Sequence, residues 1–272
     1  MIEVIQEMLQ HTFMTKAIIV GALVSLSASL LGVSLVLKRY SMIGTGLSHV
    51  GFGILTISVA VGWAPLPITI PIVIIMAVIL LKIGNNSKIK SDSAIALISS
   101  TSLAIGIAVT SITTGMNTDV CNFMFGSILV MTKSDVILSI TVSIIVLIMF
   151  VIYYRKLFII TFDEEFSKAI GLKFKRYTNL IAILTAVIIV VGMRMMGTML
   201  ISSIIIFPAL TSMAVFKTFK SVVVSSAIVS VTGFLIGIYL SYIYGISTGA
   251  MIVLVNLLLF IIFNLFGKIV RE

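Results

Sequence analysis

The chain has 272 residues, of which 60% are hydrophobic and only 10% are charged, and its mean hydropathy is +1.29. A soluble domain carries about 25% charged residues, so these values exclude a soluble protein and predict an integral membrane protein. The formal net charge of +9 would suit nucleic-acid binding. The cations fall mainly in the loops expected on one side of the membrane, so we attribute the positive charge to membrane topology. We therefore expect no nucleic-acid partner.

Apolar segments long enough to cross roughly 30 Å of hydrocarbon recur along the whole chain. They do not alternate polar and apolar residues as the strands of a membrane barrel do, so we expect helices. The expected fold is all-α and polytopic, with a single transmembrane domain over residues 1–272 and one short cytoplasmic helix over 161–172. We place nine spans at about 14–37, 43–62, 65–82, 94–114, 136–154, 178–193, 196–214, 221–243 and 248–266.

The lysines and arginines predict the orientation through the positive-inside rule. With the N-terminus outside, 15 of the 18 basic residues fall on the cytoplasmic side, and only Lys16, Lys133 and Arg194 fall elsewhere. An odd number of spans then puts the C-terminus in the cytoplasm. We therefore expect a multi-pass protein of the plasma membrane, surrounded by the lipid bilayer.

The first candidate site lies in the sequence KRYSMIGTGLSHVGFG, which begins at Lys38. If a helix rises directly from Arg39, His49 lies on the order of 15 Å deep, near the middle of the membrane, and a turn after Arg39 would make it shallower. Thr45 lies one helical turn earlier on the same face. An ionisable residue inside the membrane points to function, and imidazole is a common metal ligand. The alternative is a histidine that only forms a hydrogen bond with a neighbouring helix. Glycines surround this histidine and would let a partner helix or a passing ion come close: Gly46, Gly51 and Gly53.

The longest cytoplasmic loop, TFDEEFSKAIGLKFKRY, begins at Thr161 and predicts a short amphipathic helix. Thr161 and Glu164 have the spacing of a capping box, and Asp163 and Glu165 suit the positive helix start. Gly171 is placed to end the helix. The apolar face is either a surface that lies on lipid or a socket for a soluble partner. That face consists of Phe162, Phe166, Ala169 and Ile170.

The sequence also excludes several activities. The ATP-binding motif G-x-x-x-x-G-K-[ST] is absent, so we expect no enzyme activity in this chain, and any ATP hydrolysis must occur on a partner. None of the nine carboxylates falls in the expected membrane interior, which argues against a carrier driven by protons or sodium. An intramembrane metalloprotease would need H-E-x-x-H or a comparable ligand set, and His49 has no second histidine or glutamate nearby.

Five further residues complete the candidates. Asp119 and Cys121 fall near the expected outer surface and, with His11, could form a loose external metal site. No spacing motif links the three, so we favour the interpretation that they are separate surface residues. Gly197 and Pro208 are expected to kink or pack the helices that contain them.

Several segments resemble the zinc/manganese/iron permeases of bacterial ATP-binding-cassette importers, the ABC-3 type membrane subunit. LGVSLVLKRYSMIGTGLSHVGFG, which contains His49, is similar to the family's second-helix signature L-G-x-x-x-V-x-R-R-x-S-x-x-G-D-x-x-S-H. Later segments of that family are matched in order by TDVCNFMFGSIL, FDEEFSKAIGL, VGMRMMGTMLISSIIIFPALTSM and LSYIYGISTGAMIVLV.

The resemblance implies a bacterial plasma-membrane permease that carries a divalent zinc, manganese or iron ion into the cell and holds no permanent cofactor. It implies a second copy of the permease or a related chain, two copies of a cytoplasmic ATPase, and an extracellular solute-binding protein. The loop helix becomes a coupling helix that docks on the ATPase, and His49 becomes part of the pathway. The same architecture carrying a metal chelate stays open as an alternative.

The sequence departs from the family pattern at three positions. Thr45 stands where the family usually has aspartate, Ser127 replaces a frequent aspartate, and Gly245 stands where a carboxylate often precedes the closing helix. A site made of imidazole and hydroxyl lacks a charged oxygen and would hold a divalent cation weakly. Weak binding suits a conduit, which must release what it accepts, and it leaves the identity of the cargo open.

Overall fold

The computed structural model describes residues 12–86, 91–113 and 133–269, together with Met8, Gln10, Met124 and Gly126. Its described residues form α-helices and no strand, which confirms the all-α prediction. In chain order the helices are α2 (Thr12–Leu37), α3 (Ser41–Ala60), α4 (Pro65–Asn86), α5 (Ser91–Ile112), α7 (Lys133–Phe162), α8 (Glu164–Ala169), α9 (Phe174–Met196), α10 (Thr198–Val215), α11 (Phe219–Tyr244) and α12 (Thr248–Ile269).

Nine helices in the described part of the chain are long and apolar enough to cross a membrane, as the sequence predicts. The short helix α8 has six residues and is not among them. The largest difference from the predicted bounds is in α7, which was expected to end near residue 154 and continues to Phe162. At about 1.5 Å per residue the 30 residues of α7 extend beyond a hydrocarbon layer of roughly 30 Å.

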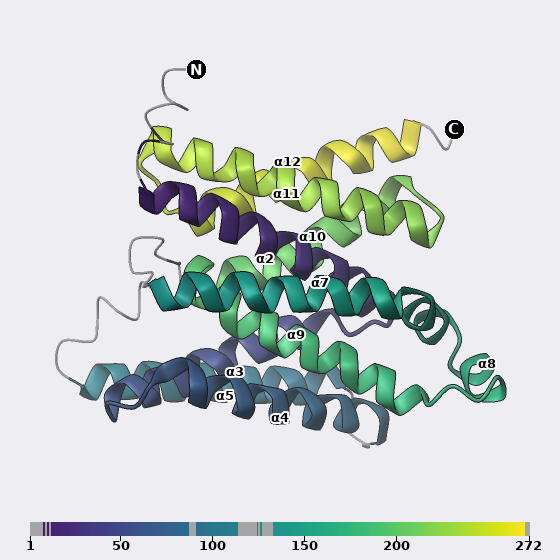
Figure 1. Ribbon diagram of the computed structural model, residues 1–272, viewed down its shortest axis with the longest axis horizontal. Coiled ribbons are helices and arrows are strands. Elements are labelled where there is room, and N and C mark those ends of the chain that lie inside the picture. The colour runs from purple at the N-terminus through teal and green to yellow at the C-terminus, as the bar shows by residue number, and fades with distance from the viewer. Residues whose placement is uncertain are drawn as a thin grey trace.

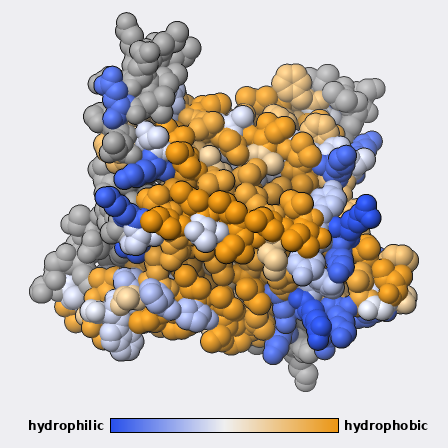
Figure 2. All heavy atoms as spheres, viewed as in Figure 1, coloured by the Kyte–Doolittle hydropathy of each residue, from blue (hydrophilic) through white to orange (hydrophobic). Residues whose placement is uncertain are grey.

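The long helices run side by side, with α8 at the right-hand end of the view in Figure 1. Helix α2 begins at the left-hand end and α12 finishes at the right-hand end, as an odd number of crossings requires. Figure 2 shows a hydrophobic band across the middle, with hydrophilic residues gathered toward the two ends. We call the end that carries α8 the coupling end.

Burial divides the helices into an inner and an outer set. In the most apolar stretch of α9, 72% of the residues are buried within the chain, and α2 and α3 reach 67%. The corresponding share is 22% for α7 and α12 and 17% for α5. The outer helices therefore present apolar side chains that lipid or another membrane protein must cover, because water would leave them unfavourably hydrated.

Glycines allow α3 to pack closely against its neighbours. A Cβ atom at Gly53 would lie 2.6 Å from the carbonyl oxygen of Ser102 on α5. A Cβ atom at Gly46 would lie 2.7 Å from the Ile95 side chain, and one at Gly51 would approach α9 equally closely. The structure thus places these three glycines at helix contacts.

We expect Gly53→Ala to destabilise the protein and Gly44→Ala to leave its stability unchanged or slightly raised. The added methyl at 53 meets a backbone oxygen, so α5 must shift, and such overpacking costs about 1–3 kcal/mol. At Gly44 the nearest atom is the Ile205 side-chain tip at 3.5 Å, an ordinary contact, and alanine favours a helix. Thermal unfolding of the two variants in detergent measures the difference, and equal midpoints would contradict this account.

Candidate functional site

A tight turn sets the start of α3 and therefore the depth of His49. Arg39 has a left-handed φ of 61°, and the Tyr40 amide donates a hydrogen bond of 2.8 Å to the Leu35 carbonyl, as in a Schellman motif. Helix α3 begins at Ser41, so His49 lies about 12 Å along its axis at about 1.5 Å per residue. This is somewhat shallower than a helix rising from Arg39 would give, and it is still well inside the span.

The imidazole of His49 forms a hydrogen bond to a neighbouring helix. Its Nδ1 lies 2.6 Å from Oγ of Ser99 on α5, and Ser99 is buried. No hydrogen bond joins Nε2 of His49 to another residue in the described part of the chain. A histidine ligand is commonly oriented by a hydrogen bond at its other ring nitrogen. The contact to Ser99 is therefore compatible with both interpretations of this residue.

His49 and Thr45 line a groove of about 550 Å³ between α3, α10 and α12. Met199 and Leu254 also line it, and they are 53% and 51% exposed, so the groove opens onto the surface of the chain. The other lining residues contribute hydroxyl or apolar groups: Leu200, Ser202, Ser203, Gly249, Ala250 and Val253. We call this space the α3/α10/α12 groove.

The groove contains one side chain of a type that can bind metal ions, but the described residues do not form a complete metal site. Among the described residues, no group of three or more histidine, cysteine, aspartate or glutamate side chains lies close enough to hold a metal. The groove offers the imidazole of His49 and hydroxyl groups, including that of Thr45. The external set of His11, Asp119 and Cys121 lies outside the described residues and stays a prediction. Ser127 also lies outside them.

Two glycines and a proline shape the helices from α9 to α11. Gly197, with φ 86° and ψ 160°, separates α9 from α10, and this backbone conformation strongly favours glycine. Pro208 is buried inside α10, where it cannot donate a backbone hydrogen bond. Gly245 is the left-handed residue that ends α11. Its backbone conformation accounts for a glycine where the family often has a carboxylate.

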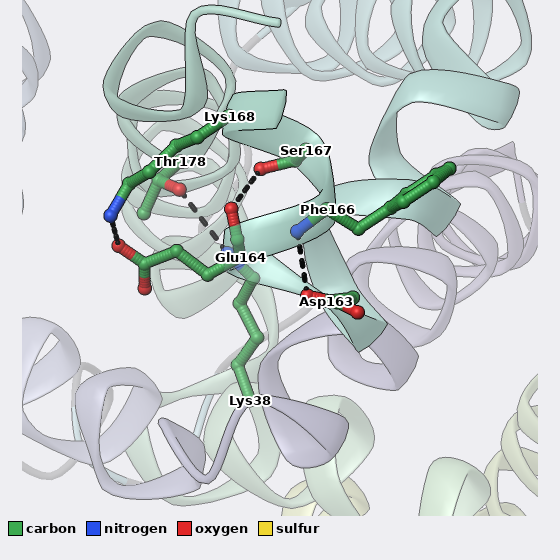
Figure 3. Close-up of polar contacts among 7 residues, drawn as sticks. All are labelled: Lys38, Asp163, Glu164, Phe166, Ser167, Lys168 and Thr178. Carbon is green, nitrogen blue, oxygen red and sulfur yellow. Dashed lines mark hydrogen bonds and ion pairs between the residues drawn. The ribbon is translucent and has the colours of Figure 1, made fainter. Parts of the chain in front are cut away.

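Helix α8 forms as predicted, with a different first residue. The Asp163 side chain accepts a hydrogen bond of 2.8 Å from the Phe166 amide and caps the helix (Figure 3). Thr161, which was predicted to cap it, belongs to α7, and its hydroxyl donates to the Leu157 carbonyl at 2.6 Å. The predicted capping box is therefore wrong. Gly171 ends the helix with a left-handed φ of 78°, as predicted.

One face of α8 exposes apolar side chains. Phe166 and Ile170 are 53% and 49% exposed, and the Phe166 ring points away from the Glu164–Lys168 ion pair (Figure 3). Phe162 is 58% exposed, but it belongs to α7 and its ring centroid lies 5.8 Å from that of Phe219. Every residue of α8 except Ser167 is exposed, as are the two residues after it: Glu164, Glu165, Phe166, Lys168, Ala169, Ile170 and Gly171.

Lys38 connects the turn before α3 with the first turns of α9. Its Nζ donates a hydrogen bond of 3.2 Å to Oγ1 of Thr178 and lies 4.5 Å from the centroid of the Phe174 ring. Burial lowers the pKa of Lys38 from 10.5 to about 8, and the nearby Glu164 carboxylate acts in the opposite direction. Sequence reasoning assigned Lys38 only to topology and did not single out Ser99, because each finds its partner on a helix far away in the chain.

The lowered pKa predicts how stability depends on pH. Between about pH 8 and about pH 10.5 the unfolded chain binds more protons at Lys38 than the folded chain does, so its burial destabilises the protein less as the pH rises. We expect the thermal midpoint of the wild type, relative to Lys38→Met, to rise between about pH 7 and about pH 10. Lys220→Met, which removes an exposed lysine, is the control. A constant difference across this range would contradict the assignment.

These features define a class of protein: a polytopic membrane permease with a largely apolar surface groove that contains one histidine and several hydroxyl groups, and with a loop helix that exposes apolar side chains. The profile of the ABC 3 transport family matches residues 10–267. The chain belongs to this family, as the sequence resemblance implied.

The relatives cover nearly the whole chain. The manganese import system permease protein ScaB of Streptococcus gordonii is 30% identical over 260 residues, which are 96% of this chain and 93% of ScaB. A Haemophilus influenzae protein described as a probable iron transport system membrane protein is 30% identical over 97% of both chains. The structure of PsaBC from Streptococcus pneumoniae matches with a TM-score of 0.86, 30% identity, and coverage of 97% and 95%.

Proposed function

We propose that this chain is the permease of an importer that moves a divalent metal ion, manganese, iron or zinc, across the plasma membrane of a bacterium. The observation that carries the proposal is the position of His49 and Thr45 in a groove that opens onto the surface of the chain, with both residues inside the membrane-spanning helix α3. The names of relatives similar over almost the whole chain, which include manganese and iron transport, support the choice of cargo.

A second copy of the chain completes the site in this proposal. One chain offers a single imidazole and hydroxyl groups to the groove, which is too few ligands to strip water from a divalent cation. Two copies related by a twofold axis would place two His49 and two Thr45 side chains around a common pathway. Imidazole binds zinc, iron and manganese to different degrees. With no carboxylate at position 45, the pair would bind the cation loosely enough to release it.

Two further partners follow from the family. A cytoplasmic ATPase, in two copies, would hydrolyse ATP and dock on α8, and an extracellular solute-binding protein would deliver the metal. The permease would hold no permanent cofactor, because the ion passes through. The exposed Phe166 and Ile170 supply an apolar surface for the ATPase. The capped start of α8 and the close of that helix at Gly171 hold this surface in place.

The orientation is tested by labelling from outside the cell. The positive-inside rule places the coupling end in the cytoplasm and the N-terminus outside. In a Cys121→Ser background, we expect an impermeant thiol reagent to modify Trp63→Cys and to leave Lys173→Cys unmodified in intact cells. Both positions are exposed, at opposite ends of the bundle. Labelling of Lys173→Cys without lysis would reverse the orientation.

The cargo is tested by reconstituting the permease with its ATPase and binding protein in vesicles. We expect ATP-dependent accumulation of at least one of manganese, iron and zinc when each is offered as the free ion. A solved ABC transporter assigned to the metal-chelate type matches with a TM-score of 0.76 but only 16% identity, which shows the shared fold alone. Uptake of an iron chelate and of none of the free ions would overturn the proposal in favour of that alternative.

A further inference from the structure

A second groove lies at the coupling end, between α7 and α11 and apart from the α3/α10/α12 groove. This open groove has a volume of about 530 Å³. Aromatic rings form much of its wall: the Phe219 ring centroid lies 5.5 Å from that of Tyr154 and 5.1 Å from that of Phe158. Two exposed cations, Arg155 and Lys220, also line the groove, together with Ile159 and Thr218. We call this space the α7/α11 groove.

Its depth is set by the apolar length of α7. The part of the helix without charged residues begins at Val136, and Arg155 lies about 29 Å further along the axis at about 1.5 Å per residue. A hydrocarbon layer is roughly 30 Å thick, so Arg155 lies where acyl chains meet headgroups. Lys220 is at the same end of the bundle, in the first turn of α11.

No described carboxylate forms an ion pair with the cations of this groove, Arg155 and Lys220. The ion pairs among the described residues are Lys168–Glu164 and Arg194–Asp135. The N-terminus of α11 adds the positive end of a helix dipole. An arginine guanidinium suits a phosphate group, which it can bind through two parallel hydrogen bonds. The groove therefore matches an anionic phosphate.

An apolar stripe leads from the groove toward the middle of the membrane. Val151 and Ile148 lie one and two turns before Arg155 on the same face of α7, and they are 70% and 52% exposed. A phosphate compound without acyl chains would leave this stripe uncovered. A phospholipid matches both parts, with its headgroup at the cations and an acyl chain along the stripe.

We propose that the α7/α11 groove is a binding site for an anionic phospholipid, such as phosphatidylglycerol, of the leaflet at the coupling end. Basic pockets between transmembrane helices bind anionic headgroups in this way. Lysine or arginine near an anionic headgroup contributes a factor of about five in affinity, so two cations give about twenty-five-fold. The proposal does not depend on the cargo, because no residue of the α3/α10/α12 groove takes part.

Fluorescence quenching tests this site directly. Trp63 is the only tryptophan in the sequence, so Trp63→Phe combined with Phe158→Trp places the single fluorophore in the groove. The purified variant is reconstituted in phosphatidylcholine vesicles that contain brominated phosphatidylglycerol or brominated phosphatidylcholine. We expect phosphatidylglycerol to bind on the order of twenty-five times more tightly than phosphatidylcholine at this position. Inorganic phosphate should not displace it, because phosphate lacks the acyl chain that would lie along the apolar stripe.

Charge variants separate this groove from general surface charge. In the reporter background, the double variant Arg155→Gln with Lys220→Gln should bind phosphatidylglycerol and phosphatidylcholine with about equal affinity. The matched control, Lys82→Gln with Lys268→Gln, removes two exposed cations from the same end. It should keep the preference for phosphatidylglycerol over phosphatidylcholine. Equal quenching by both brominated lipids, or an equal loss in the control, overturns the proposal. Loss of ATPase binding by Arg155→Gln with Lys220→Gln, with the lipid preference unchanged, would also overturn it and assign the groove to the ATPase.

Discussion

His49→Gln should abolish most metal uptake in vesicles that contain the complete importer, by at least tenfold. Glutamine has a similar length and can keep a hydrogen bond to Ser99, so a role limited to packing would be preserved. Its amide is a much poorer ligand than imidazole for first-row metal ions. ATP-dependent uptake of manganese, iron and zinc, measured at equal amounts of assembled complex, gives the size of the loss.

Two variants sharpen this prediction. Ser99→Ala removes the group that orients the ring and keeps the ligand, so it should lower uptake less than His49→Gln does. Thr45→Asp adds a carboxylate one turn from the imidazole, and it should bind the cation more tightly while slowing its release. Normal uptake of all three metals by both His49→Gln and His49→Ala would rule out a pathway role for this residue.

Phe166→Ala should weaken binding of the ATPase by about thirtyfold. An exposed aromatic side chain that becomes a buried anchor in a complex typically costs 2 kcal/mol or more when truncated, and each 1.4 kcal/mol is a factor of about ten. The affinity of the ATPase for the permease in lipid nanodiscs measures the effect, and thermal unfolding shows that the membrane helices stay intact.

Phe162→Ala is the matched control for this result. Both rings are more than half exposed, but Phe162 lies on α7, where its centroid is 5.1 Å from that of Phe158. We expect its truncation to reduce ATPase affinity several-fold less than that of Phe166. An ATPase that binds Phe166→Ala with wild-type affinity would place the docking surface elsewhere on the coupling end.

The spans could be predicted from the sequence because a backbone in lipid has few alternatives to a helix. The end of α7 could not, because Arg155 and Lys156 look like the start of a loop. The helix continues past them since its later residues still pack, as the buried Leu157 and Ile160 show. This extension takes Thr161 into α7 and leaves the cap of α8 to Asp163. Both residues are good caps, so local sequence alone did not separate them.

The groove was only partly predictable for a similar reason. His49 stands out because ionisable residues are rare inside membranes, and Thr45 follows from helical spacing. The walls contributed by α10 and α12, such as Met199 and Val253, come from segments whose composition resembles that of any other span. Ser99 is one of many serines in apolar helices. Ser99 becomes the partner of His49 only because α5 packs against α3, and no local sequence pattern encodes that contact.

The hydrogen bond from His49 to Ser99 ties the imidazole to the least enclosed helix of the bundle. Helix α5 packs substantially only on α3 and α4 within the described chain, and 17% of its most apolar stretch is buried. The orientation of the ring therefore depends on how α5 packs against α3. Lateral pressure in the bilayer, or a neighbouring protein that presses on α5, would alter how often the imidazole is free to turn. In the proposed pathway role of His49, metal affinity would then respond to the physical state of the surrounding membrane.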